Sequence, residues 1–283
     1  MDLFNSLVRK KPPERLYHYT SPSGLKGILT DKVTWASVIH YLNDAEEFKY
    51  AIDLAQGILK ARPMNALAPT GQLYLKLMDV TESLGKVHIC VFSLSETGDL
   101  LSQWRAYGGR DGGYSLGFRP DLLTPFLKEQ ELYLAPCTYT PSEQTILINE
   151  VIDFIVSVFQ KKLSESKLSP ERTIESVLPG YFFYFSRIAA IIKHPAFSEE
   201  REWRIVSGPI HVNKLDYRVG KSMLIPYLPI QLRDSTNQFP VDEVIVGPTS
   251  HQNLATIAVT GLLNRAGIKH WNVTNSKIPY REL

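Results

Sequence analysis

Cysteine is scarce in this sequence: Cys90 and Cys137 are the two thiols in 283 residues. They form no CxxC pair and are too few for a disulfide framework, which excludes the disulfide-stapled class of secreted scaffold. We therefore expect a reducing, cytoplasmic location. The N-terminus lacks a basic region followed by an apolar run, so we also expect no signal peptide.

Long apolar runs are missing as well. The most apolar stretches, residues 146–159 and 181–192, are interrupted by charged side chains. Both are shorter than the roughly 20 residues that a membrane-spanning helix requires, so we expect no membrane span. Neither sign of charge is in large excess, since the chain has 31 basic residues and 29 acidic residues. This balance differs from the basic footprint of a nucleic-acid-binding domain, although it does not exclude a nucleic acid as a transient substrate.

Familiar catalytic motifs are absent. The sequence has no GxGxxG and no HExxH, which argues against a Rossmann nucleotide fold and a zinc protease helix. Residues 220–222, Gly-Lys-Ser, resemble the end of a phosphate-binding P-loop, but Leu215 occupies the position that needs the first glycine. The seven histidines are scattered and form no recognisable ligand cluster with cysteine or acidic residues.

The patterning that is present predicts one α+β domain over residues 1–283. Hydrophobic residues make up 44% of the chain, enough for a substantial core, and short strand patterns outnumber strand–helix alternations. Residues 1–13 predict a lead-in arm, and residues 141–193 predict a helical insert whose second helix is broken at Pro179-Gly180. The expected strands are 15–20, 33–37, 87–93, 114–118, 131–139, 202–207, 210–217, 222–226, 241–246 and 268–273, and the expected helices are 21–29, 43–61, 71–84, 100–107, 142–164, 170–193 and 250–266.

The most informative stretch is residues 198–207, Ser-Glu-Glu-Arg-Glu-Trp-Arg-Ile-Val-Ser. Read as a strand, it has two different faces, because side chains alternate along a strand. The faces are Glu200, Glu202 and Arg204 on one side and Arg201, Trp203 and Ile205 on the other. Strands disfavour acidic residues, so a charged front with an apolar back indicates the wall of a polar cleft. The alternative is a half-buried strand whose ion-paired face is simply solvated.

Polar residues gather in four blocks at the expected ends of strands and helices, where clefts are formed. The blocks are Tyr17–Thr20; Trp35–Ser37 with Asn43, Asp44 and Glu46; Ser93 with Ser102–Tyr107; and Lys193 with Glu200–Arg204. Each block also has a structural alternative. The alternatives are a core position for His18, Trp35 and Trp203, helix packing for Trp104 and Tyr107, a helix cap for Asn43, Asp44 and Lys193, and neutralisation of Glu202 by Arg204.

The order and spacing of these blocks resemble a bacterial domain family of unknown function that has been placed near the ADP-ribosyltransferase superfamily. The matching segments cover most of the chain: Leu16–Thr20 (LYHYT), Trp35–Phe48 (WAS…LNDAEEF), Phe92–Phe118 (FS…SQW…GG…GF), Glu200–Ile205 (EREWRI) and Val241–Pro248 (VDEVIVGP). The resemblance implies the fold of that superfamily, with split antiparallel sheets, peripheral helices and a helical insert.

The resemblance to transferases of the His-Tyr-Glu type also implies roles for single residues. His18, with Tyr19 and Thr20 beside it, is similar to the first-strand histidine that binds the adenosine ribose of NAD. Trp35 stands where an aromatic residue stacks on nicotinamide, although the residue type differs from the usual tyrosine. Glu202 stands where the catalytic glutamate opens a strand.

Further charged residues complete the implied site. Glu200 resembles the second glutamate of toxin-like members, and Arg105, Lys193 or Arg204 could hold pyrophosphate or pair with Glu200. Breaking the nicotinamide–ribose bond produces an oxocarbenium-like centre, which a neighbouring carboxylate can stabilise. A flat aromatic ring can bind the cationic nicotinamide face-on.

The resemblance therefore predicts an NAD-dependent, ADP-ribosyltransferase-like enzyme that consumes NAD as its substrate, as in a toxin or an anti-phage defence effector. The acceptor would be a protein, a nucleic acid or water. Two alternatives stay open. The first is a non-catalytic ligand-binding or sensor module on the same fold. The second is a nucleic-acid-acting enzyme whose Asp44, Glu46, Glu200 and Glu202 bind a metal ion.

Overall fold

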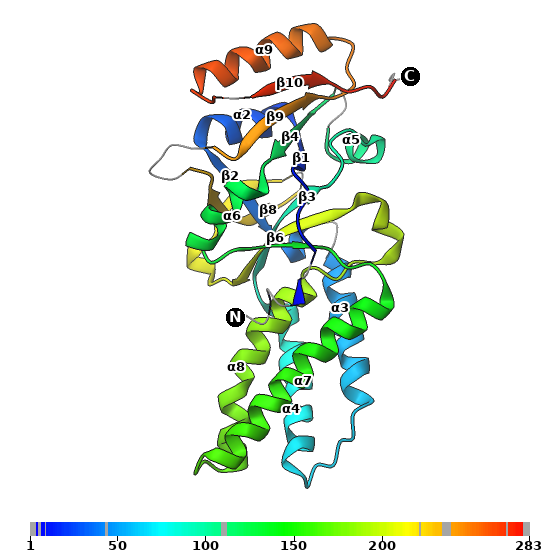
Figure 1. Cartoon of the computed structure of the whole chain (residues 1–283), viewed down its shortest axis with the longest axis vertical. Helices are drawn as coiled ribbons and strands as arrows, with labels where there is room; N and C mark the ends of the chain where they lie inside the picture. The colour runs from blue at the N-terminus through cyan, green and yellow to red at the C-terminus, as the bar shows by residue number, and fades with distance from the viewer. Residues whose placement is uncertain are drawn as a thin grey trace.

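The computed structural model describes residues 4, 7–8, 10–42, 45–108, 112–220, 222–233, 239–269 and 271–279, with the backbone alone at residue 45. The molecule is elongated, with a twisted sheet and its covering helices at one end and a bundle of long helices at the other (Figure 1). The predicted helix start at Asn43 and Asp44 lies outside the described residues.

Ten strands in the described part of the chain form one open, mostly antiparallel sheet, which confirms the predicted α+β class. Their order is β10-β9-β4-β1-β3-β2-β8-β7, with β6 beside β3 and β5 beside β6. The strands are β1 Leu16–Thr20, β2 Val33–Val38, β3 Ile89–Ser95, β4 Tyr114–Phe118, β5 Tyr133–Pro136, β6 Glu202–Pro209, β7 Asp216–Val219, β8 Leu224–Gln231, β9 Val241–Val246 and β10 Asn272–Asn275.

The sheet divides at its central strand, β3. Val91 of β3 pairs with β2 on one side and β6 on the other, and Ser95 of β3 pairs with β1 on one side and β6 on the other. Because β6 runs along one edge of β3, both β1 and β2 must lie on the opposite edge. Strands β1 and β2 therefore pair with different parts of that edge, and Ser93 lies between those parts. The sheet divides there into two branches, one that begins with β1 and one that begins with β2.

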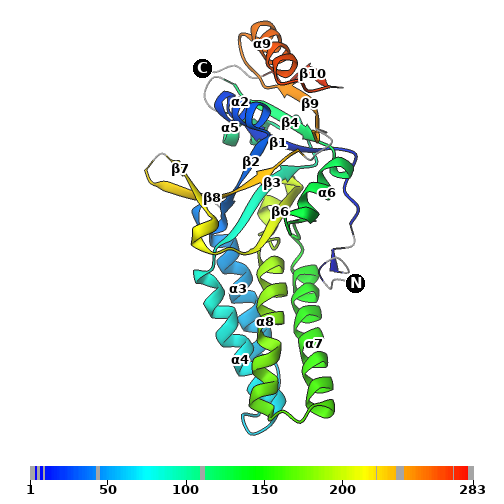
Figure 2. The ribbon, with the colours of Figure 1, turned by 90° about the vertical axis from the view of Figure 1, so that its left-hand side faces the viewer.

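Helices cover the sheet unequally. They are α2 Pro22–Asp31, α3 Ala45–Lys60, α4 Pro69–Ser83, α5 Leu101–Tyr107, α6 Pro120–Glu129, α7 Pro141–Glu165, α8 Pro170–Ala189 and α9 Gln252–Arg265. The long helices α3, α4, α7 and α8 lie side by side below the sheet (Figure 2). The predicted insert, residues 141–193, thus forms α7 and α8 and shares one apolar core with α3 and α4.

Because side chains alternate along β3 and β6, these two strands contribute to two cores, one on each face of the sheet. Val91 and Val206 face the bundle core, which also holds Phe4 from the predicted N-terminal arm. Phe92 and Ile205 face the sheet core, which is covered by α2, α6 and α9. None of the helices in the described residues combines the length and the apolar character that a bilayer crossing requires.

Several local expectations were wrong. Helix α8 continues through Pro179 without a break, because its neighbours Val177 and Tyr181 are buried in the bundle core and outweigh the roughly 3 kcal/mol that an interior proline costs. Helix α6 was not predicted. The expected strand at 210–217 is instead a short 3₁₀ turn at Val212–Lys214 followed by β7, and β10 starts later than expected, at residue 272.

Candidate functional site

A cleft of about 710 Å³ opens where the sheet divides. Its walls come from the end of β1, helix α2, strand β2, the middle of β3 and the β7–β8 hairpin. The residues that line it are His18, Tyr19, Thr20, Ser21, Ser23, Gly24, Gly27, Ile28, Asp31, Val33, Thr34, Trp35, Ser37, Tyr41, Leu42, Val91, Phe92, Ser93, Tyr107, Arg218, Val219 and Ile225. The cleft thus unites residues from three of the predicted polar blocks and adds the β7–β8 hairpin, which the sequence did not place at the site.

The turn from β1 into α2 shapes one wall of the cleft. Ser21 caps α2, because its side-chain oxygen accepts a hydrogen bond from the Gly24 amide at 3.3 Å, and Pro22 begins the helix, as predicted. A Cβ atom on Gly24 would lie 2.0 Å from Oγ1 of Thr20. The missing side chain therefore allows the first turn of α2 to lie directly against the end of β1.

His18 lies in the gap of the sheet. Its Nδ1 is 3.0 Å from the carbonyl oxygen of Ser93, and because a carbonyl can only accept, Nδ1 carries the proton of this bond. The ring packs on Phe92, with centroids 4.2 Å apart. Burial lowers the pKa of His18 to about 4, against the weaker opposing effect of the Ser93 bond, so the imidazole is neutral at pH 7. His18 is thus hydrogen-bonded like a core histidine and also forms part of the cleft wall.

Trp35 presents an aromatic surface to the cleft. Its side chain is 47% exposed, which excludes the core alternative for this residue. The indole stacks on the ring of Tyr227 from β8, with centroids 4.6 Å apart and planes 28° apart. A stacked pair of this kind holds the indole in one orientation and leaves its exposed part available to a flat ligand.

A second, smaller cavity of about 40 Å³ continues the cleft toward β6. Its wall contains Glu200, Glu202 and Gln103, and it shares His18, Tyr19, Ser93 and Tyr107 with the cleft. The two spaces are therefore adjacent and share part of their walls, and we call the smaller one the acidic pocket. Tyr107 was expected to be a packing residue, but its side chain is 45% exposed and lines both spaces.

Glu202 is buried at the first position of β6, with both carboxylate oxygens bound. Oε2 lies 2.8 Å from Nζ of Lys193, and Oε1 lies 2.8 Å from Nε of Arg204. The Glu202 amide donates a 2.8 Å hydrogen bond to the hydroxyl of Tyr139, which fixes the start of the strand. Burial raises the pKa of Glu202, but Arg204 and Lys193 together outweigh it and hold the pKa at about 2. The carboxylate is therefore ionised at any physiological pH.

Two further acids join this cluster. Glu47 of α3 lies 3.1 Å from Nη2 of Arg204 and 3.5 Å from Nζ of Lys193, and Glu200 lies 2.7 Å from the same Nζ. Among the side chains described here, three carboxylates therefore face two cations. From the sequence, Glu47 is a candidate metal ligand together with Asp44 and Glu46, or an acid at a helix start, and neither interpretation predicts its contact with Arg204 and Lys193.

The backbone between the two glutamates departs from the predicted strand. Arg201 has a positive φ of 43°, which is unusual for a residue with a side chain, and β6 begins only after it. The turn brings Glu200 and Glu202 to the same lysine, where strand alternation would have placed them farther apart. From Glu202 onward the predicted alternation is confirmed, because Trp203 lies in the sheet core and Arg204 in the charged cluster.

The predicted cationic residues lie away from both spaces. Arg105 is exposed on α5 and lines neither the cleft nor the acidic pocket. Lys193 and Arg204 are 2% and 0% exposed at their side chains, and they lie behind the carboxylates instead of on the wall. The structure therefore gives them a positioning role toward Glu202, while Arg218 of β7 reaches the cleft unpredicted.

The predicted metal set is not assembled in the described residues. They contain no group of three or more histidine, cysteine, aspartate or glutamate side chains placed to hold a metal ion. Glu200 and Glu202 meet at Lys193, and Glu46 is exposed on α3, while Asp44 lies outside the described residues.

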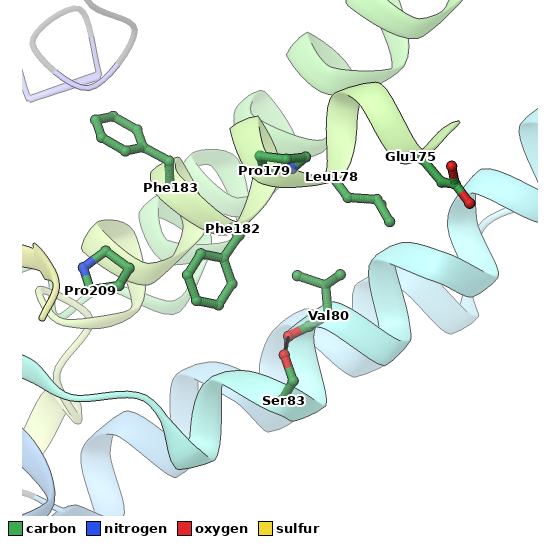
Figure 3. Close-up of a pocket in the computed structure, with 8 residues that line it drawn as sticks. All are labelled: Val80, Ser83, Glu175, Leu178, Pro179, Phe182, Phe183 and Pro209. Carbon is green, nitrogen blue, oxygen red and sulfur yellow. Dashed lines mark hydrogen bonds between the residues drawn. The ribbon is translucent and has the colours of Figure 1, made fainter. Parts of the chain in front are cut away.

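Another hollow, of about 520 Å³, lies between α4 and α8 in the bundle (Figure 3). Phe182 and Leu178 point toward α4, Phe183 points away from it, and Glu175 is the charged residue in the lining (Figure 3). This apolar hollow shares no lining residue with the cleft and offers no group of reactive side chains. The candidate site is therefore the cleft with its acidic pocket.

A family model described as a protein of unknown function (DUF2971) matches residues 103–205. The match begins in α5 and ends in β6, so the DUF2971 region includes Lys193, Glu200 and Glu202 but not the cleft residues of β1 and β2. No curated protein and no solved structure matches the chain.

Proposed function

We propose that this protein binds NAD in the cleft and cleaves its nicotinamide–ribose bond beside the acidic pocket. The observation that carries the proposal is the wall that the two spaces share. An exposed, stacked indole lines the cleft and the carboxylates of Glu200 and Glu202 line the pocket, while His18 and Ser93 line both. The resemblance to ADP-ribosyltransferases supports the same assignment through the order of His18, Trp35 and Glu202.

The size and lining of the cleft suit such a ligand. A volume of about 710 Å³ lies within the range of small-molecule and cofactor sites, about 300–1,000 Å³. The wall combines apolar side chains with a few polar groups, among them Thr20, Ser37 and Arg218. In this assignment the exposed indole of Trp35 stacks on nicotinamide, and neutral His18 and Thr20 contact ribose hydroxyls.

The charge of the acidic pocket suits the chemistry. Glu200 and Glu202 line the pocket, and their carboxylates favour a positive centre there. As the bond breaks, nicotinamide leaves as a neutral molecule with the electron pair, and the ribose carbon becomes oxocarbenium-like. Glu202 stabilises that charge as a fixed anion. Glu200, whose side chain is 25% exposed, takes the proton that the attacking acceptor or water releases.

A second function, ligand binding without turnover, is favoured by one specific observation. Both oxygens of Glu202 are occupied by Lys193 and Arg204, so a substrate hydroxyl must share an acceptor that already has a strong partner. In that case the same cleft would act as a sensor of a nucleotide. A role as a toxin or defence effector belongs to the catalytic proposal, since it requires consumption of NAD or modification of an acceptor.

Nicotinamide release from NAD distinguishes these functions. We expect release by the wild type and its loss, by at least about 100-fold, in Glu202→Gln, since removing a preorganised charge of this kind typically costs that much. Glu200→Gln should slow release less. Glu175→Gln, an exposed glutamate at the bundle hollow, serves as the matched control and should keep full activity.

The assay is run with and without cell lysate, and thermal unfolding confirms that each variant is folded. Release that requires lysate identifies a macromolecular acceptor, whereas release in buffer identifies hydrolysis. If folded wild type binds NAD and releases no nicotinamide under either condition, the catalytic proposal is wrong and the binding function replaces it.

A further inference from the structure

Charged side chains are unevenly distributed in the wall of the cleft, and the predicted cations Arg105, Lys193 and Arg204 are not among them. Of the described residues in its wall, Asp31 and Arg218 carry a permanent charge, and His18 is neutral at pH 7. Asp31 ends α2, where the helix dipole is also negative. The acidic pocket adds further negative charge at the β6 side. Among the described wall residues, the positive charge is therefore that of Arg218 on the β7–β8 hairpin.

Arg218 is held over the floor of the cleft by the geometry of that hairpin. It pairs with Ile225 across the two strands, and both residues line the cleft, so they face it from the same side of the hairpin. Tyr227, two residues along β8, stacks on Trp35. The hairpin, which projects from the side of the sheet in Figure 2, thus presents a guanidinium beside the aromatic pair.

The contact that Arg218 makes with the floor is weak. Its Nη2 lies 3.5 Å from Oγ of Ser37, a buried residue of β2, at the limit of a hydrogen bond. A guanidinium has five donors in a planar fork and binds phosphate oxygens in pairs. An anion at this position would receive shorter bonds from Arg218, and the Ser37 hydroxyl could donate to it as well.

We propose that Arg218 and Ser37 form a phosphate subsite of the cleft, which receives the pyrophosphate of a dinucleotide. The identity of the ligand rests on the proposed function, but the subsite itself requires only a phosphorylated ligand. It orients that ligand, because the phosphates lie at the hairpin and away from Asp31 and the acidic pocket, where like charge would repel them. The ring next to the phosphates then lies on Trp35.

The subsite is tested by titration calorimetry with inorganic pyrophosphate, ADP-ribose and nicotinamide. The proteins are the full-length wild type, Arg218→Met, Arg218→Lys and Arg105→Met. Arg105 is the matched control, because it is an exposed arginine of this chain that lines neither space. Arg218→Met removes the charge while keeping a long side chain over the floor.

We expect Arg218→Met to bind ADP-ribose about 10- to 100-fold more weakly than the wild type, since hydrogen bonds to charged groups contribute on that scale. Pyrophosphate binding should fall in parallel and nicotinamide binding should stay unchanged. Arg218→Lys should retain part of the affinity, because it keeps the charge without the planar fork. Arg105→Met should bind all three ligands like the wild type.

The outcomes separate this inference from the proposed function. Equal binding of ADP-ribose by wild type and Arg218→Met overturns the subsite, even if nicotinamide release is observed. Binding of pyrophosphate that depends on Arg218, without any nicotinamide release from NAD, supports the subsite and contradicts the enzyme. A wild type that binds neither phosphorylated ligand overturns the subsite directly.

Discussion

Replacing Glu202 with glutamine should destabilise the protein strongly and change the way its stability depends on pH. Glutamine keeps the shape of the side chain but removes the charge between Lys193 and Arg204. Both cations are almost fully buried, at 2% and 0% exposure, so neither can recover its hydration. Breaking a buried pair by removing one partner typically costs about 3–5 kcal/mol, and we expect a loss in that range at pH 7.

The pKa of Glu202 supports a similar magnitude. It is lowered from 4.5 to about 2, and a difference of that size corresponds to roughly 3 kcal/mol of unfolding free energy. The sign follows from linkage: the folded pKa is below the unfolded value, so the stabilisation is complete above about pH 4.5. It is lost as the pH falls from 4.5 through 2, because the unfolded chain then binds a proton that the folded chain does not.

Urea unfolding of wild type and Glu202→Gln at pH 7, 5 and 3 measures both effects. The difference in unfolding free energy between the two proteins should be large at pH 7 and 5 and should shrink at pH 3. Other carboxyl groups titrate in both proteins and cancel in this difference. A difference that is the same at all three pH values, or below about 1 kcal/mol at pH 7, would refute the reasoning that this buried carboxylate is held ionised by its two cations.

Three further predictions concern the cleft. Trp35→Ala should weaken NAD binding by calorimetry about tenfold with little change in melting temperature, because the indole is 47% exposed; equal affinity would remove it from the site. Gly24→Ala should lower the free energy of unfolding by about 1–3 kcal/mol, because the added Cβ clashes with Thr20. Gly27→Ala should raise it by about 0.5–1 kcal/mol, because a Cβ there meets nothing within 4 Å. Thermal unfolding in which the two variants behave alike would contradict the close approach of α2 to β1. The affinity for the ligand, measured between pH 8 and 5.5, should show no change caused by titration of His18, since the pKa of His18 is about 4. A change in affinity near pH 6.5 that disappears in His18→Asn would show that burial does not hold the imidazole neutral.

Features that depend on local pattern could be predicted from the sequence. Alternation along residues 202–205 placed Trp203 in an apolar core and Arg204 on the charged side, and both placements are confirmed. The helix expected over residues 21–29 is present as α2, Pro22–Asp31. These features are set by neighbours a few residues apart, which a sequence displays directly.

Features that depend on distant contacts could not be predicted. Arg204 meets Glu47 across 157 positions of sequence, and Arg218 meets Ser37 across 181. No local pattern marks either pair, so the sequence indicates Glu47 only as a metal ligand or a helix-start acid and does not indicate Arg218. Pro179 shows the opposite error, because a strong local signal for a helix break is overridden by burial of its neighbours in the bundle core.

The most direct test of the central claim is a crystal structure with an NAD analogue whose nicotinamide–ribose bond cannot be cleaved. We expect the analogue to lie in the cleft, with its nicotinamide ring on Trp35 and its ribose facing Glu200 and Glu202 at the acidic pocket. An analogue bound elsewhere, such as in the hollow between α4 and α8, or oriented with its nicotinamide away from Trp35 and the acidic pocket, would contradict it.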